Sequence, residues 1–186
     1  ADDMVIFCKS KASAEQTLAH IIPHIEKKLF LKVNKEKTVV AYAGKIKFLG
    51  YGFYKSRKGF GLRVHKKAQQ KMRKRVKELT SRRTVNDYEK WKQELKRFVV
   101  GWVNYFKLAD MRQLLTSTNE WMRRRIRMVF WKKWKRIRTK YKNLRKLGLN
   151  HIDAYMTANC RKGYWAVVNT RTVKTALSSQ KLERAG

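Results

Sequence analysis

The chain has 186 residues, and its 47 lysines and arginines against 13 aspartates and glutamates give a formal net charge of +34. Hydrophobic residues make up 43% of the sequence, enough for a buried core, so the composition argues against a disordered chain. The length suits one or two compact units, and the charge favours a polyanionic partner, most simply a nucleic acid. A basic protein of the membrane surface is the alternative, although no stretch has the run of apolar residues that a spanning helix needs.

The sequence begins with two adjacent carboxylates, Asp2 and Asp3, followed by an apolar run at residues 4–8 that is typical of a strand. A tight turn ahead of that strand would hold both acids at one point, where carboxylate oxygens suit Mg²⁺ and a two-metal phosphoryl-transfer site. A solvated turn is the alternative, because about one adjacent acidic pair is expected by chance in such a chain. A strand this early has no partner strand before it, so we expect a fragment or a processed product.

The remaining metal-ligand candidates are few. Cys8 and Cys160 are far apart and lack the spacing of metal ligands, which fits a reduced intracellular protein. The histidines lie outside any Cys/His cluster, and we interpret each as a surface or core side chain: His20, His24, His65 and His151.

Residues 1–64 are predicted to form a β-α-β-β-β unit. A capping box at Ser13 and Gln16 starts a helix whose apolar residues keep helical spacing as far as Leu29. Pro23 falls inside this helix, so we expect a kink near residues 19–22. Strands are expected at residues 38–42, 46–54 and 60–64, with turns at Gly44 and at residues 56–59.

From about residue 65 the chain is predicted to be helical, and it becomes far more basic. The first helix carries one apolar stripe, formed by Ala68, Met72, Val76 and Leu79. After a break at residues 81–85, Asn86 is expected to cap a second helix, whose seam is typical of a helix bundle: Tyr88, Trp91, Leu95, Phe98, Trp102 and Tyr105. Gly101 weakens this helix from within, so we expect it to allow close packing of helices.

A third helical region starts near Met111 and is expected to end at Gly148. Its apolar stripe runs through Met122, Ile126, Phe130, Trp134, Ile137, Tyr141 and Leu144. Between Trp121 and Ile152 there are 13 lysines or arginines and no acid, and helices of one charge sign repel themselves unless a polyanion neutralises them. Trp131, off the stripe, is expected either to stack on bases or to shield the bundle.

Residues 150–186 are less periodic than the helices before them. Residues 159–165 are predicted to form a basic, aromatic turn, and residues 172–182 a last short helix. Composition leaves open whether this tail packs on the helices or becomes ordered only with RNA.

Several motifs, taken in order, resemble those of group II intron reverse transcriptases. Residues 1–6 resemble the second catalytic palm motif without its first residue, and residues 31–38 resemble the palm motif that follows it. Residues 48–53 are similar to the primer-grip hairpin, and residues 88–106 to the maturase-specific thumb called domain X. Residues 159–165 resemble the basic, aromatic tail of intron proteins that lack an endonuclease domain.

The resemblance implies an α+β fold, in which a partial reverse-transcriptase palm sheet is followed by a helical thumb bundle. Residues 1–64 would be the C-terminal part of the palm with the primer grip, residues 65–149 the thumb or domain X, and residues 150–186 a basic aromatic tail. The fingers and the palm strand that supplies the third metal-binding carboxylate are absent, so we expect this chain alone to be inactive as a polymerase.

The family's activities would be RNA-directed DNA synthesis and assistance to the splicing of its own intron, which is maturase function. The implied partners are group II intron RNA, an RNA template–DNA primer duplex, dNTPs and target DNA, with no membrane and with a homodimer left open. The implied location is a ribonucleoprotein in the bacterial cytoplasm, with an organelle as the alternative.

The resemblance also implies roles for single residues. Asp2 and Asp3 would bind Mg²⁺, and Lys37 would lie near the leaving pyrophosphate unless it is a plain surface lysine. The primer terminus would be held by Phe48, Leu49, Gly50, Tyr51 and Gly52, where the glycines let a backbone approach sugar and phosphate, unless this is a plain core hairpin. Nucleic acid would be gripped by Arg123, Arg124, Arg125, Arg127, Lys132, Lys133, Lys135, Arg136, Arg161 and Lys162.

Two other hypotheses are compatible with the sequence. One is a non-catalytic, basic RNA-binding chaperone in which the acidic pair is incidental. The other is a domesticated reverse transcriptase, such as a defence-associated one. Alanine at Asp2 and Asp3 in the full-length protein tests the first, because loss of the metal site should abolish DNA synthesis and leave RNA affinity nearly intact.

Overall fold

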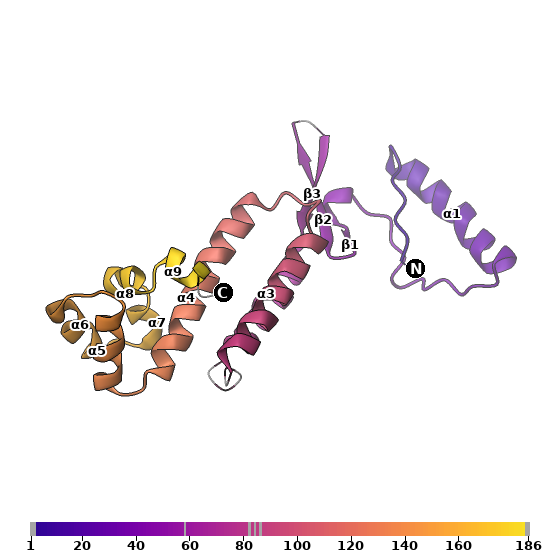
Figure 1. The fold of residues 1–186 in the computed structure, drawn as a ribbon. Helices are drawn as coiled ribbons and strands as arrows, with labels where there is room; N and C mark the ends of the chain where they lie inside the picture. Colours follow the sequence, from indigo (N-terminus) through magenta and orange to yellow (C-terminus); the bar gives the residue numbers. More distant parts are fainter. Residues whose placement is uncertain (1–2, 58, 82, 84, 86, 185–186) are drawn as a thin grey trace. The chain divides into compact units, whose positions relative to one another are not determined.

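The computed structural model describes residues 3–57, 59–81, 83, 85 and 87–184. The chain divides into two compact units, which we call the sheet unit (residues 1–68 and 108–110) and the helical unit (residues 69–107 and 111–186). Helices and a small antiparallel sheet make the described chain α+β, as predicted (Figure 1). The palm and thumb identities depend on the resemblance and stay predictions.

The longest element of the sheet unit is the helix α1 (Lys11–Lys28). Its N-cap is Ser10, whose Oγ accepts a hydrogen bond from the backbone N–H of Ser13 at 3.1 Å. The predicted cap at Ser13 is therefore wrong, because the first turn of the helix already contains that residue. Pro23 lies inside the helix without ending it, and no residue of α1 is buried.

Two of the predicted strands, at residues 4–8 and 38–42, are wrong. Both segments lack regular secondary structure, and the three-stranded sheet of the described residues includes neither of them. A strand is stable only when a neighbouring strand receives its backbone hydrogen bonds. Their apolar, β-prone residues are therefore not enough to form strands without a pairing partner.

The sheet is built from β1 (Lys47–Phe48), β2 (Tyr51–Ser56) and β3 (Gly59–Val64), after the 3-10 turn η1 (Ala43–Lys45). The strands pair antiparallel in the order β1-β2-β3, and Phe48 lies opposite Tyr51. Leu49 and Gly50 between them have φ values of 47° and 83°, and two consecutive positive values suit a two-residue hairpin turn. The single strand predicted at residues 46–54 is therefore wrong, because this turn divides it.

Residues 108–110 belong to the sheet unit through Asp110. Its backbone N–H donates to the Leu62 carbonyl at 2.7 Å, and the Tyr54 hydroxyl donates to Asp110 Oδ2 at 3.2 Å. Gly61 lies opposite Tyr54, and a Cβ at Gly61 would come within 2.6 Å of the Tyr54 ring. The missing side chain at Gly61 therefore lets Tyr54 lie across β3, and the hydrogen bond to Asp110 raises the pKa of Tyr54.

The helical unit takes up most of the later helices: α2 (Lys66–Leu79), α3 (Tyr88–Tyr105), α4 (Arg112–Lys133), α5 (Ile137–Lys146), α6 (His151–Ala158), α7 (Tyr164–Val167), α8 (Arg171–Ala176) and α9 (Ser179–Arg184). Asp87 is the N-cap of α3, because its carboxylate accepts from the backbone N–H groups of Glu89 and Lys90. The predicted cap at Asn86 lies outside the described residues.

Helix α4 is covered by two separate hydrophobic clusters. Val129 packs with residues on and between α2 and α3, among them Leu79, Val85, Trp91 and Leu95. Met128 and Trp131 pack with α5 to α8, which Figure 1 shows gathered around one end of α4. The predicted stripe is therefore incomplete, since it names only half-buried residues of α4 and misses the fully buried ones between them. It also spans a break, because α4 ends at Lys133 and α5 begins at Ile137.

Two further expectations are decided by burial. Trp131 is 2% exposed, so it shields the core and its predicted alternative role in base stacking is wrong. Gly101 is exposed, and a Cβ there would meet nothing within 4 Å, so the predicted close packing at Gly101 is wrong.

The tail after residue 150 packs on the helical unit, which answers the question left open by its composition. Its apolar residues complete the cluster around Met128 and Trp131: Ala154, Ala158, Val167, Val168, Val173, Ala176 and Leu177. The last predicted helix, at residues 172–182, is present as two short helices, α8 and α9.

Candidate nucleic-acid interface

The described part of the sheet unit does not form a metal centre. Asp2 lies outside the described residues, and Asp3 is exposed in a segment without regular structure. Among the described residues no three His, Cys, Asp or Glu side chains gather where they could hold a metal ion. Asp3 alone does not make a Mg²⁺ site, so no catalytic step follows from this geometry, and the roles of Asp2 and Asp3 stay predictions.

Lys37 lies on a turn of the sheet unit, and the expected primer grip spans the β1–β2 hairpin. Lys37 is exposed, and its backbone N–H donates to the backbone carbonyl and to Oδ1 of Asn34, both at 3.2 Å. Leu49 and Gly50 form the tip of the β1–β2 hairpin, and Leu49 is 54% exposed. The hairpin lies where the resemblance placed one, and its contact with a primer stays a prediction, as does the role of Lys37.

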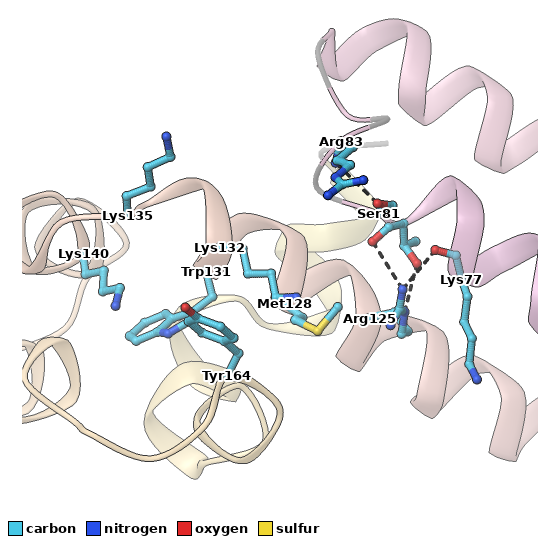
Figure 2. A pocket seen from close by; sticks show the side chains of 11 residues that line it. Lys77, Ser81, Arg83, Arg125, Met128, Trp131, Lys132, Lys135, Lys140 and Tyr164 are labelled. Carbon is cyan, nitrogen blue, oxygen red and sulfur yellow. Dashed lines mark hydrogen bonds between the residues drawn. The ribbon is translucent and has the colours of Figure 1, made fainter.

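The helical unit holds a pocket of about 460 Å³ with a strongly cationic lining (Figure 2). Its polar and charged lining residues are Lys77, Thr80, Ser81, Arg83, Arg125, Lys132, Lys135 and Lys140, and Met128, Trp131 and Tyr164 complete the wall. No carboxylate lines the pocket, and none of the ion pairs between described residues involves one of its cations. Six of the eleven lining residues are therefore cationic and none is anionic, which favours an anionic ligand.

Arg125 fixes one wall of the pocket to the end of α2. Its Nε donates to Thr80 Oγ1 at 2.9 Å, and its Nη2 donates to the carbonyls of Lys77 and Thr80 at 3.0 and 3.4 Å, as Figure 2 shows. Thr80 is fully buried and donates its hydroxyl to the Val76 carbonyl. Burial lowers the pKa of Arg125. Three hydrogen bonds donated by Arg125 are thus used inside the protein, to Thr80 and to Lys77.

Aromatic rings support the cations on the opposite wall. Lys140 Nζ lies 5.0 Å from the ring centroid of Trp131, and Lys132 Nζ lies 5.2 Å from that of Tyr164. The negative face of an aromatic ring attracts a cation by about 0.5–1 kcal/mol at exposed sites. These contacts hold the ammonium groups near the cavity without neutralising them, so their charge stays available to a phosphate.

The structure gives the other predicted cations different surroundings. Arg124 is anchored to Trp165, and Arg123 Nε donates to Asn119 Oδ1 at 3.0 Å. Arg127 is only 6% exposed and donates Nε to the Leu177 carbonyl at 2.9 Å; burial, with a smaller effect of Arg123, lowers its pKa. The remaining predicted cations are half-buried or exposed: Lys133, Arg136, Arg161 and Lys162.

Only Arg125, Lys132 and Lys135 of the predicted cations meet in the pocket. Three further cations of the pocket, Lys77, Arg83 and Lys140, were not predicted, and neither was the aromatic lining residue Tyr164. Lys77 and Arg83 lie in the basic stretch that the sequence assigns to helix and break. Tyr164 lies in the stretch predicted as a basic, aromatic turn, and that prediction is wrong at its end, because Tyr164 already begins α7. Both signals were visible, but only the fold brings the two stretches together.

The chain contains a range, nearly all of it in the helical unit, that matches a known protein family. Residues 69–148 match the family described as the group II intron, maturase-specific domain. No curated protein matches the chain. Among the described residues no helix is long and apolar enough to cross a bilayer. The matched range contains every pocket residue except Tyr164, which the packed tail supplies. Residues 69–148, less than half of the chain, are therefore similar to the group II intron maturase-specific domain.

Proposed function

We propose that this protein binds group II intron RNA through its helical unit and assists splicing as a maturase. The observation that carries the proposal is a pocket with six cationic lining residues and no carboxylate, nearly all of it within the residues that match the maturase-specific domain. A nucleic-acid backbone supplies the anions that this cavity lacks, and bound lysines and arginines release the counterions of the phosphates.

Such a surface can favour a folded RNA without reading its bases. Phosphate contacts set the position and orientation of the nucleic acid and carry no sequence information of their own. Because RNA strands that fold against each other repel through their phosphates, cations fixed on a rigid helical frame lower the free energy of a compact arrangement. Support for splicing would follow from stabilising that arrangement.

The binding experiment compares the chain's affinity for a group II intron RNA with its affinity for an unrelated structured RNA of equal length, at several salt concentrations. We expect tighter binding to the intron RNA and a steep loss of affinity with salt in both cases. Equal affinities would favour the non-catalytic RNA chaperone, and failure to bind either RNA would contradict the proposal.

The polymerase part of the proposal applies to a longer protein that would carry this sequence. The resemblance of residues 1–6, 31–38 and 48–53 to reverse-transcriptase motifs supports RNA-directed DNA synthesis, with a primer–template duplex, dNTPs and target DNA as partners. Mg²⁺ bound at Asp2 and Asp3 would supply charge neutralisation at the reacting phosphates. Primer extension by the intact protein tests this: alanine at both positions should abolish DNA synthesis and spare RNA binding. Persistent synthesis would refute the assignment.

A further inference from the structure

We infer that the cationic pocket accepts one unpaired nucleotide of a single-stranded RNA. The base of this nucleotide stacks on Tyr164, and the neighbouring phosphates are bound by Lys132, Lys135 and Lys140. The inference rests on the proposed function, because it takes RNA as the partner, and it adds the strand state and the residues that recognise it. The pocket volume of about 460 Å³ falls in the range of small-ligand sites, which suits one nucleotide and excludes a duplex.

Tyr164 is the aromatic side chain of the pocket that a base can reach. Tyr164 is 53% exposed, whereas Trp131 is 2% exposed and is approached by Lys140. Every base has an aromatic face, so stacking on an exposed ring is possible for any sequence. The internal bases of an A-form duplex are already stacked on both faces and paired, so along the length of a strand an unpaired nucleotide is the one that can place its base on Tyr164.

Lys132 has two alternative partners in this arrangement. Its Nζ lies 5.2 Å from the Tyr164 ring centroid, a contact that is weak at an exposed site. A phosphate offers Lys132 a charge-assisted hydrogen bond, which is stronger than a neutral one. The arrival of a nucleotide thus moves the ammonium group from the ring to the phosphate, and the ring face that it leaves becomes available to the base.

Lys135 and Lys140 line the same pocket from different elements. Lys135 lies in the connection between α4 and α5 and is exposed, and Lys140 lies on α5. Figure 2 shows Lys140 extending toward the Trp131 ring, on the side of the pocket where Tyr164 lies. The cations and the stacking ring therefore come from α4, α5, the turn between them, and α7, all within the helical unit.

The test measures the affinity of the full chain for a single-stranded oligoribonucleotide of ten uridines and for an RNA duplex of ten base pairs, by fluorescence anisotropy. Tyr164→Leu, which keeps bulk without an aromatic face, should weaken single-strand binding about 5- to 150-fold, the effect of losing one stacked base. Tyr164→Phe should bind as wild type does, and duplex binding should change less than two-fold in both variants. Tyr155→Leu is the matched control, because Tyr155 is also exposed at 58% and lies on α6 outside the pocket.

The outcomes separate this inference from the proposed function. If Tyr164→Leu and wild type bind the single strand equally while intron RNA still binds, the stacking site is refuted and RNA binding by the helical unit stands. If the wild-type chain binds neither the oligonucleotides nor intron RNA, the proposed function is refuted, and the inference that rests on it is refuted with it. Equal losses for the single strand and the duplex would mean that Tyr164 acts only on the fold, and would also refute the inference. In a competition experiment, a free dNTP that displaces the bound single strand at a lower concentration than the unlabelled oligoribonucleotide does would refute a site specific for an RNA strand.

Discussion

Arg124 lies over the indole ring of Trp165, with its guanidinium carbon 4.0 Å from the ring centroid, and it also donates Nε and Nη2 to the Trp165 carbonyl at 3.1 and 2.6 Å. The two residues belong to α4 and α7, so this pair joins the tail to the matched maturase-specific domain. Arg124 thus makes both a cation–π contact and hydrogen bonds with Trp165, the residue that follows Tyr164, the proposed stacking residue.

Removal of this anchor should loosen the tail. We expect Arg124→Ala to lower the free energy of unfolding by about 1–2 kcal/mol, because it loses charge-assisted hydrogen bonds and a cation–π contact. Arg124→Lys keeps the charge and loses the paired hydrogen bonds, so its free energy of unfolding should lie between those of the wild type and Arg124→Ala. Urea unfolding measures the effect, and Arg138→Ala on the exposed face of α5 is the control. A loss no larger than that of the control would contradict the anchoring role.

Gly101 should be replaceable with a gain in stability. A Cβ there would meet nothing within 4 Å, and alanine favours a helix interior over glycine by about 0.5–1 kcal/mol. We therefore expect Gly101→Ala to raise the melting temperature of the helical unit. Gly148→Ala is the opposite control, because its φ of 95° is strained for any side chain and the variant should melt earlier. A destabilising Gly101→Ala would show that another element packs on this position.

His65 should make the stability of the sheet unit depend on pH below neutrality. Burial, and then the charges of Lys47 and Lys67, lower the pKa of His65, and its Nδ1 accepts a hydrogen bond from the Lys67 backbone N–H at 3.2 Å. The folded state thus prefers neutral imidazole. The contribution is fully present above the ordinary value of about 6.5 and is lost as the pH falls through the lower folded pKa.

Nuclear magnetic resonance titration of His65 checks the direction of this shift. We expect a pKa below 6.5, and His65→Asn should flatten the dependence of unfolding free energy on pH below about 6.5. A pKa at or above the ordinary value would contradict the assigned surroundings of His65.

The helices could be predicted from sequence because their evidence is local, whereas two strands and several side-chain environments could not. Spacing alone located the buried stripe of α2 at Met72, Val76 and Leu79. Residues 38–42 have the composition of a strand, but pairing is a non-local condition that composition does not report.

The site was only partly predictable for a related reason. Charge density in the sequence indicates a basic surface, but it does not tell which arginines the fold uses internally. Arg127 resembles its neighbours in sequence and is nevertheless buried against the Leu177 carbonyl, because the tail packs over it. The same packing of the tail places Tyr164 in the pocket lining, and the spacing of residues within α4 could not have indicated that position.

The most direct measurement is the salt dependence of intron RNA affinity for the wild-type chain and for a variant with Lys132, Lys135 and Lys140 all changed to Gln. A control variant carries the same change at Lys27, Lys28 and Lys32, which are exposed in the sheet unit. If the pocket lysines neutralise phosphates, the slope of log K against log salt should become shallower by about 2 in the pocket variant, with a smaller change in the control. Equal slopes and equal affinities for the pocket variant and the wild-type chain would contradict RNA binding at the pocket.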